Sequence, residues 1–552
     1  MTKVEDLPKN HIASTVEKEN TDIEIENTGE NGAGDIPAED SATEGNTKLK
    51  EVLVELAMGT TIHGVANIVS ATKTYKKLLW LSLWILALVG YCFQLSQIHN
   101  TYTTAQKTTT MDLQFGVLNF PGVTFCNLNP VKKSLLRETP LDLQLFLTIS
   151  ESVMKLYSEP ISVEIDRNHP GFQFLNNFEK HGFNTEGWDV LSYIPTDPLQ
   201  TRDIFIKSEI SKMNRSTVER IGHTIDDMLL HCSFNSMICN SSFFTPISST
   251  RFGNCYTLKS DQLVTTVPGP PYGLTLVLDM ETYEYVSPSS SGNGIKLVIH
   301  EPDSYPFVEE QGVNVAPGRT SIGLNRIEIQ RLKHPHGNCE DHKDYVNQYG
   351  IEYSKMACEQ LCQVTLTQDI CGCIPTIVSI DPSIVTSFSK FCGTMDIPCA
   401  ILVRQAQVKG DLYCPCTNPC LENVYTKTIS SHSWPRQEYL IHEIIPLICE
   451  DTERAKKVVN ITGYTCEDFL LMDLPEDSIQ AFRDNFVKLD VYFEDLNYEH
   501  IEEVPSYDIY QFLSDIGGAT GLFVGASVLS LVEVVQILVE IIKYAVCRHV
   551  KK

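Results

Sequence analysis

Basic residues are scarce in this sequence. Its 552 residues hold 43 lysines and arginines against 70 aspartates and glutamates, so the formal net charge at pH 7 is −27. Nucleic acids are bound by clusters of Lys and Arg, and this balance therefore argues against a nucleic-acid partner. No lysine cluster suited to a triphosphate stands out either. The acidic surface is suited to cations, or is simply solvated.

Charged residues are absent from residues 78–98. A helix of that length reaches roughly 30 Å, the thickness of the hydrocarbon core of a bilayer. The stretch begins far from the N-terminus and has no small-residue cleavage site, so we expect a retained first transmembrane helix rather than a signal peptide. A second apolar stretch, residues 509–546, is longer than one crossing needs. It is expected to tilt, break or project beyond the bilayer.

Basic residues flank both apolar stretches on the sides that face the chain termini. They are Lys73, Lys76 and Lys77 before the first stretch, and Lys543, Arg548, Lys551 and Lys552 at the end of the second. The positive-inside bias then predicts a multi-pass plasma-membrane protein with both termini in the cytosol. Residues 99–508 are predicted to be extracellular, and residues 547–552 form a short cytosolic C-terminus.

Cysteine placement supports this topology. Of 18 cysteines, only Cys92 and Cys547 lie outside the segment from Cys126 to Cys466, and the remaining even set is typical of an oxidised ectodomain. Three glycosylation sequons lie in the same segment, at Asn214, Asn240 and Asn460.

Metal binding is the alternative use of these cysteines, because His334, His336 and His342 lie near Cys339. The one- and three-residue gaps between the cysteines do not match the two-residue gaps of most zinc sites. An extracellular setting also favours oxidation, so we predict disulfides and no metal.

Residues 1–48 are rich in acidic and small polar residues and have little to bury, which predicts a disordered cytosolic tail. Residues 49–77 form a pre-membrane segment with a His-Gly dipeptide at its centre. In the ectodomain, residues 274–278, 295–300 and 486–493 are predicted strands, and residues 217–230 a predicted helix. The expected fold class is α+β, with a sheet surrounded by helices.

Six motifs in order give this chain a family resemblance. They are His63-Gly64, FPGVTFCN at 120–127, GNCYT at 253–257, Tyr353-Ser354 before a cysteine ladder, DIGG at 515–518, and Gly525-Ala526-Ser527. In order and spacing they resemble the degenerin/epithelial sodium channel family, which includes acid-sensing and peptide-gated channels. The resemblance covers His63 to about Lys543.

The resemblance implies a homotrimer or heterotrimer with two transmembrane helices per subunit and a hand-like, disulfide-rich ectodomain. It implies a plasma-membrane channel that passes Na⁺, is blocked by amiloride and needs no cofactor. The family pattern also implies seven disulfides, and Cys449 with Cys466 is left as an eighth. The seven are Cys126–Cys255, Cys232–Cys239, Cys339–Cys420, Cys358–Cys416, Cys362–Cys414, Cys371–Cys399 and Cys373–Cys392.

The resemblance places a selectivity filter at Gly525, Ala526 and Ser527, where the second helix breaks. Small side chains let three copies approach an axis, so that carbonyls and hydroxyls replace part of the hydration of a cation. Tight helix packing is the alternative explanation of the small residues. It leaves unexplained Glu533 and Glu540, two carboxylates on one helix face at membrane depth.

Further pore and gate residues follow from the same resemblance. Asp515 is the candidate for an outer ring of carboxylates, followed by Gly517 and Gly518. His63 and Gly64 form the expected gating motif before the first transmembrane helix.

The stimulus that opens the channel is predicted from two positions at which this chain differs from the acid-sensing members of the family. Acid-sensing members carry a histidine pair after the first transmembrane helix, where this chain has residues 100–106 without one, and a tryptophan where this chain has His336. Both departures argue against fast proton gating. The acidic tail and the Cys449/Cys466 pair look more like FMRFamide-gated channels, and a cationic amidated peptide suits an acidic ectodomain. Residues 126–255 are the expected region of ligand contact.

Several alternatives stay open. Within the family they are a proton-gated channel and a mechanically gated or constitutive one. Outside it they are an ATP-gated trimeric channel and a membrane-tethered receptor or ectoenzyme. The ATP-gated channel would need a lysine cluster for the triphosphate. The receptor or ectoenzyme leaves the His-Gly and Gly-Ala-Ser motifs unexplained. No nucleophile–base signature is visible, so we predict that the protein is not an enzyme.

Overall fold

A computed structural model describes the chain in two compact units, residues 1–99 with 513–552 and residues 100–512. The described residues are 64–148, 174–180 and 198–527, together with isolated residues outside these ranges. The gaps within them are 260–262, 287–288, 291, 377, 381–389, 394–395, 451 and 472–474. Each unit is treated by itself below.

The first unit is built on two helices, α3 (Thr74–Thr103) and α19 (Ile509–Val524), most of whose residues it contains. Among the described residues, α3 is the one helix long and apolar enough to cross a membrane, with a mean hydropathy of 1.9 over its most apolar window. It extends beyond the predicted residues 78–98 at both ends, because the polar residues that flank the apolar stretch continue the helix. A short helix, α2 (Val65–Ser70), precedes it.

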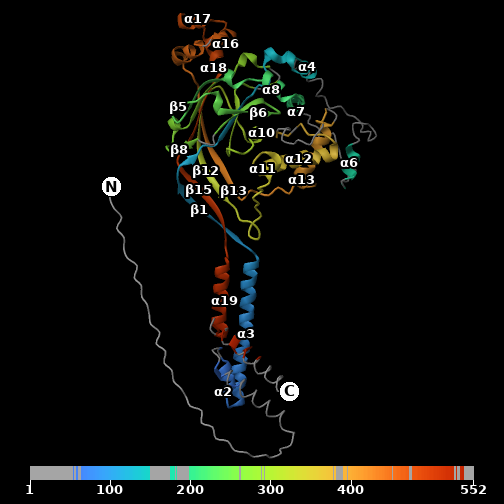
Figure 1. The fold of residues 1–552 in the computed structure, drawn as a ribbon, viewed down its shortest axis with the longest axis vertical. Helices are drawn as coiled ribbons and strands as arrows, with labels where there is room; N and C mark the ends of the chain where they lie inside the picture. Colours follow the sequence, from blue (N-terminus) through green and yellow to red (C-terminus); the bar gives the residue numbers. More distant parts are fainter. Residues whose placement is uncertain are drawn as a thin grey trace, which may run out of the picture. The chain divides into compact units, whose positions relative to one another are not determined.

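The second unit contains a large mixed sheet, drawn in Figure 1. Its strand order is β1-β15-β12-β14-β9-β4-β5, and β13 pairs with β12. The strands are β1 (Lys107–Phe115), β15 (Asn497–Pro505), β12 (Gly318–Gln330), β14 (Phe486–Phe493), β9 (Leu274–Asp279), β4 (Leu229–Phe234), β5 (Met237–Ile238) and β13 (Leu421–His432). Two of these strands, β9 and β14, lie where apolar β-branched and aromatic residues predicted them.

A second sheet has the order β11-β10-β3-β7-β6, and a two-stranded sheet pairs β2 with β8. The strands are β11 (Val313–Val315), β10 (Ile295–His300), β3 (Gly122–Asn127), β7 (Gly253–Leu258), β6 (Phe244–Ser249), β2 (Leu118–Asn119) and β8 (Val264–Thr265). One apolar core is shared between this sheet and the large one. In it, the rings of Phe120 and Phe493 meet edge to face with centroids 6.0 Å apart.

Helices lie around the sheets, as the α+β class predicts. On one side Figure 1 shows α12 (Lys355–Cys371) and α13 (Ile397–Lys409), with α11 (Tyr345–Tyr349) beside them. The same unit also contains α4 (Leu141–Thr148), α6 (Phe174–Lys180), α7 (Pro198–Ser211), α8 (Arg215–Ile221), α9 (Ile225–Met228) and α10 (Val308–Gln311).

Residues 437–483, between β13 and β14, form a separate helical group that we call the α14–α18 unit. Its helices are α14 (Gln437–Tyr439), α15 (Ile445–Cys449), α16 (Thr452–Thr462), α17 (Cys466–Leu471) and α18 (Glu476–Arg483). Its apolar residues form one cluster with Leu230 of β4, Val277 of β9 and Phe486 of β14. The unit is therefore attached to the sheet by its own small core.

The predicted helix at residues 217–230 is wrong as a single element. The structure has α8 and α9 with a break at Gly222-His223-Thr224, and β4 begins at Leu229. The Thr224 side chain accepts the backbone N–H of Asp227 and so begins a new helix. His223 bonds a distant carboxylate instead of continuing α8, so tertiary contacts override the apolar periodicity.

Candidate functional site

The Gly-Ala-Ser segment lies at a break in the backbone. Helix α19 ends at Val524, Gly525 has a φ of 69°, and residues 525–527 are not helical. A positive φ favours glycine because a Cβ atom strains that conformation. After the break, the Ser527 N–H donates to Ser530 Oγ at 2.9 Å and the Ser530 N–H to Ser527 Oγ at 3.4 Å. The two serines thus satisfy each other's backbone N–H groups in the manner of a capping pair.

Helix α19 contains three glycines that are not needed to make room for any other described part of the chain. A Cβ atom added at Gly517, Gly518 or Gly521 would meet nothing within 4 Å. Glycine inside a helix costs roughly 0.5–1 kcal/mol relative to alanine. Asp515 is exposed on the same helix, whereas Glu533 and Glu540 lie outside the described residues. The arrangement leaves room for another molecule to approach the backbone of α19.

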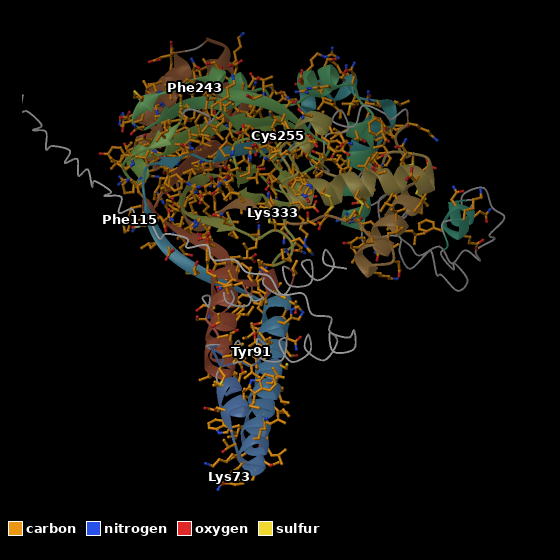
Figure 2. The ribbon with its side chains drawn as sticks, turned by 60° about the horizontal axis from the view of Figure 1, so that its bottom comes forward. Lys73, Tyr91, Phe115, Phe243, Cys255 and Lys333 are labelled. Atoms are coloured by element: carbon orange, nitrogen blue, oxygen red, sulfur yellow. A yellow bond between two sulfur atoms is a disulfide. The ribbon has the colours of Figure 1, made fainter. Side chains whose placement is uncertain are left out.

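Within the first unit, α3 and α19 pack at a glycine. A Cβ atom at Gly90 would lie 2.8 Å from the ring of Phe523, so the two helices approach closely there. One residue further on, Tyr91 lies at the same contact (Figure 2), and its hydroxyl is 3.0 Å from Thr520 Oγ1.

We expect Gly90→Leu to disrupt this helix pair, because the new side chain must displace the Phe523 ring. Overpacking of this kind typically costs about 1–3 kcal/mol. The measurement is the current carried at matched surface expression, which should fall at least severalfold. Gly59→Leu is the control, because a Cβ atom at Gly59 meets nothing within 4 Å. Equal currents for the two variants would contradict this packing.

Of the predicted gating motif, Gly64 is described and His63 lies outside the described residues. Gly64 is the N-cap of α2 with a φ of 86°, and a Cβ atom there would lie 3.6 Å from Trp84 Cδ1. Its left-handed conformation, more than the available space, is what requires glycine at this position.

The eight disulfides of the structure are the eight pairs expected in the sequence analysis. They are Cys126–Cys255, Cys232–Cys239, Cys339–Cys420, Cys358–Cys416, Cys362–Cys414, Cys371–Cys399, Cys373–Cys392 and Cys449–Cys466. Two of them connect successive turns of α12 to the segment before β13 and so stiffen that helix. Cys92 is an exposed free thiol, and Cys547 lies outside the described residues.

His342, one of the three histidines near Cys339, takes part in other interactions. His342 Nε2 lies 2.8 Å from Thr417 Oγ1, and its ring stacks on Tyr353 with centroids 3.6 Å apart. Cys339 itself is bonded to Cys420.

The three predicted glycosylation sites lie at the surface. Asn214, Asn240 and Asn460 are all exposed, the last of them in the final turn of α16. Asn214 and Asn240 each use the side-chain oxygen to accept a backbone N–H two residues on. The amide nitrogen, which a glycan would modify, is not needed for that bond.

Comparison with known proteins identifies the family. The family model described as "Amiloride-sensitive sodium channel" matches residues 56–537, which include the whole second unit, part of the first and the six motifs of the sequence analysis. The chain belongs to the amiloride-sensitive sodium channel family. It is therefore related to ion channels and not to enzymes, which leaves the ectoenzyme alternative without support.

Several channels of this family resemble the chain along most of its length. The FMRFamide-activated amiloride-sensitive sodium channel of Cornu aspersum is 24% identical, over 90% of this chain and 84% of the relative. The epithelial sodium channel subunit gamma of Pelodiscus sinensis is 25% identical, over 89% and 80%. Acid-sensing ion channel 1A of Danio rerio is 28% identical, over 88% of each chain. Peptide-activated, epithelial and acid-sensing members are thus all similar to this chain.

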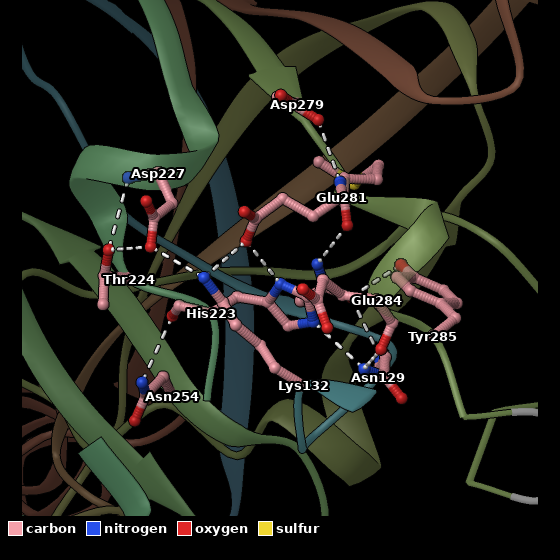
Figure 3. Close-up of polar contacts among 12 residues, drawn as sticks. Asn129, Lys132, His223, Thr224, Asp227, Asn254, Asp279, Glu281, Glu284 and Tyr285 are labelled. Atoms are coloured by element: carbon pink, nitrogen blue, oxygen red, sulfur yellow. Dashed lines mark hydrogen bonds and ion pairs between the residues drawn. The ribbon is translucent and has the colours of Figure 1, made fainter. Parts of the chain in front are cut away.

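Figure 3 shows a buried polar cluster around Glu281 that the sequence analysis did not predict. Glu281 follows β9 with a φ of 51°, and its side chain is 2% exposed. Its carboxylate lies 2.8 Å from His223 Nδ1, 3.0 Å from Lys132 Nζ and 3.0 Å from Lys457 Nζ. No local pattern announces the cluster, because its members come from four separate segments. A signal that was available is the Gly222-His223 pair inside a predicted helix.

The cluster pairs carboxylates with ammonium groups around a neutral histidine. Burial lowers the pKa of His223, so its ring is neutral at pH 7 and donates from Nδ1 to Glu281 while Nε2 accepts from Asn129. Burial alone would raise the pKa of Glu281, but the bond from His223 and the two lysine charges hold it well below its ordinary value. Glu281 and Asp227 are thus two carboxylates facing two ammonium groups.

Asp279, beside this cluster, carries a prediction about pH. Burial raises the pKa of Asp279 to about 6, against the opposing charge of Lys457 and the N–H of Glu281. Since its folded-state pKa is raised, its contribution to stability is present at low pH and is lost as the pH rises through about 6. Roughly two pKa units correspond to about 3 kcal/mol.

We therefore expect Asp279→Asn, which keeps the acceptor oxygen for Glu281 and Asn485, to stabilise the protein at pH 7.5. The gain in melting temperature of the purified channel should shrink by about half at pH 5.0. A gain that is equal at both pH values would show that Asp279 stays ionised when buried.

Proposed function

We propose that this protein is a sodium-selective, amiloride-blocked channel of the plasma membrane, opened by an extracellular FMRFamide-type peptide. Three copies, identical or mixed with related subunits, surround the pore. Each copy crosses the membrane twice, by α3 and by the stretch that begins with α19, with both termini in the cytosol. Residues 525–527 of each copy form the selectivity filter, and Asp515, Glu533 and Glu540 form rings of carboxylates along the cation path.

The observation that carries the peptide stimulus is the similarity to the FMRFamide-activated channel, which extends over 90% of this chain. The net charge of −27 supports it, because an amidated peptide with a basic residue is attracted to an acidic ectodomain. Residues 126–255, which contain α7, α8 and α9, remain our proposed region of ligand contact.

The pore assignment is supported by two features of the described residues. Glycines 517, 518 and 521 present bare backbone to open space, as expected of a helix that packs against other copies. The helix then stops at Gly525, which exposes backbone carbonyls that an ion can bind.

Proton gating is the second candidate, and the 28% identity with an acid-sensing channel favours it. Against it stand residues 100–106, which lack the histidine pair. In their place the Tyr102 ring packs on Phe512, with centroids 4.4 Å apart.

The test is expression in Xenopus oocytes under voltage clamp. FMRFamide should evoke an inward current that amiloride blocks and that disappears when external Na⁺ is replaced by a large organic cation. A step to pH 5 without peptide should evoke no comparable current. If acid alone opens the channel, the peptide proposal fails and the family assignment stands. If no condition gives an amiloride-sensitive sodium current, the channel proposal itself fails for the homomer.

A further inference from the structure

The α14–α18 unit is held to the sheet by more than its apolar core. Helix α16 presents two cations, Arg454 and Lys457, one turn apart on one face. Arg454 Nη2 donates to the backbone oxygens of Asp226 and Leu229, each at 3.1 Å, and Lys457 Nζ donates to the oxygen of Asp227 at 3.1 Å. These carbonyls lie at the end of α9, where helical partners run out. Helix α16 therefore supplies hydrogen-bond donors to the end of α9.

Lys457 reaches further, into the buried cluster. Its ammonium group lies 3.0 Å from Glu281 Oε1 and 3.7 Å from Asp227 Oδ1, and its side chain is only 13% exposed. Glu281 Oε2 faces Lys132 and His223 on its other side. The single carboxylate of Glu281, just after β9, thus contacts side chains from three other segments. They are Lys457 of α16, His223 of the turn between α8 and α9, and Lys132.

We propose that Glu281 is a positioning residue that latches α16 to the sheet and thereby couples the α14–α18 unit to channel opening. This positioning role is separate from binding the stimulus and from lining the pore. Glu281 follows directly on β9, which pairs with β14, and β14 leads through β15 into α19. A helix fixed at Glu281 is therefore fixed to the strands that continue into the second apolar stretch.

The distances explain why one residue controls the latch. The Glu281 carboxylate lies 3.0 Å from Lys132 Nζ and 3.0 Å from Lys457 Nζ. Neutralising Glu281 removes a close counter-charge from both buried ammonium groups at once, and breaking a buried ion pair by removing one partner is strongly destabilising. The apolar cluster, centred on Val458 in α16, opposes release but carries no charge specificity.

Trypsin offers a direct readout, because Arg454, Lys456 and Lys457 lie within the loop closed by Cys449–Cys466. A helix is cleaved only when it opens locally. A cut at these residues separates two pieces that only this disulfide joins. On full-length channels carrying a C-terminal tag, the product is therefore a tagged fragment that appears on gels only after reduction.

We expect Glu281→Gln to increase the rate of this cleavage at the cell surface at least tenfold. Lys457→Met, which keeps the length of the stem and leaves two cleavage sites, should increase it less, because Glu281 keeps Lys132 and His223. The double variant should be cleaved more slowly than Glu281→Gln alone, since it also removes the buried ammonium group of Lys457, which Glu281→Gln deprives of its nearest carboxylate. The matched control is Glu284→Gln, three residues on, whose carboxylate accepts the Ser134 N–H; among the described residues no hydrogen bond or ion pair joins that carboxylate to α16.

Wild-type cleavage rates for surface-expressed Glu281→Gln would overturn the latch and leave the apolar core as the sole attachment. If Glu281→Gln does not reach the surface, Lys457→Met decides alone: no increase in its cleavage rejects the proposal.

The coupling to opening has its own measurement, which rests on the proposed function. The FMRFamide concentration for half-maximal current should shift at least tenfold in Glu281→Gln and return toward wild type in the double variant. An unchanged value despite faster cleavage would reject the coupling. Absence of any peptide current would reject the proposed stimulus, while the cleavage result would still decide the latch.

Discussion

Replacing Gly525 with valine is expected to abolish sodium-selective current while leaving channels at the cell surface. The backbone at Gly525 has a φ of 69°, which a β-branched residue adopts only with strain of about 1–3 kcal/mol. The new side chain would also fill the segment where, in our proposal, three copies approach the pore axis. Surface biotinylation and the ratio of Na⁺ to K⁺ permeability are the two measurements.

Gly410→Val is the matched control for Gly525→Val. Gly410, the C-cap of α13, has a φ of 83°, and a Cβ atom there meets nothing within 4 Å. The control therefore imposes similar backbone strain in the other unit, outside the second apolar stretch, and we expect lower expression at most, with normal selectivity. Normal selectivity in Gly525→Val as well would contradict the filter assignment.

Removing Cys126–Cys255 by double substitution with serine is expected to eliminate surface expression. Both residues are fully buried between the paired strands β3 and β7, and their bridge closes a loop of 129 residues. In the chain-entropy model, losing a crosslink of that span costs about 5 kcal/mol. This is comparable with the whole stability of many domains.

Removing Cys232–Cys239 is the comparison for that experiment. This bridge closes a hairpin of seven residues between β4 and β5 and should cost only about 2 kcal/mol. We expect that variant to reach the surface at reduced levels. If both losses reduce expression equally, loop length does not determine the contribution of these bridges.

Much of the fold could be predicted from local patterns. The strands at residues 295–300 and 486–493 match β10 and β14, because runs of apolar β-branched and aromatic residues are a short-range signal. The single helix predicted at residues 217–230 is wrong because tertiary contacts interrupt it. Its apolar periodicity is present in the sequence, but Gly222 and His223 contact residues that are far away along the chain, which a local pattern cannot reveal.

The candidate site, too, was predictable from the sequence only in part. The break at Gly525 was predicted from the family resemblance and from an apolar stretch longer than one crossing needs, both of which are read from the sequence. The open space beside Gly517 and Gly518, and the close contact of Gly90 with Phe523, were not, since residues far apart in the chain determine them.

The arrangement of charge and cysteine along the chain was enough to predict a membrane topology, which stays a prediction, and a disulfide-rich segment, whose eight bridges the structure confirms. Transfer of apolar residues into a bilayer and the redox state of a compartment act on each segment separately. The tertiary structure alone decided that Glu281, one acidic residue among 70 Asp and Glu, is buried between two lysines and a histidine. Burial of a charge depends on which segments meet, and only the folded chain brings residues 132, 223, 281 and 457 together.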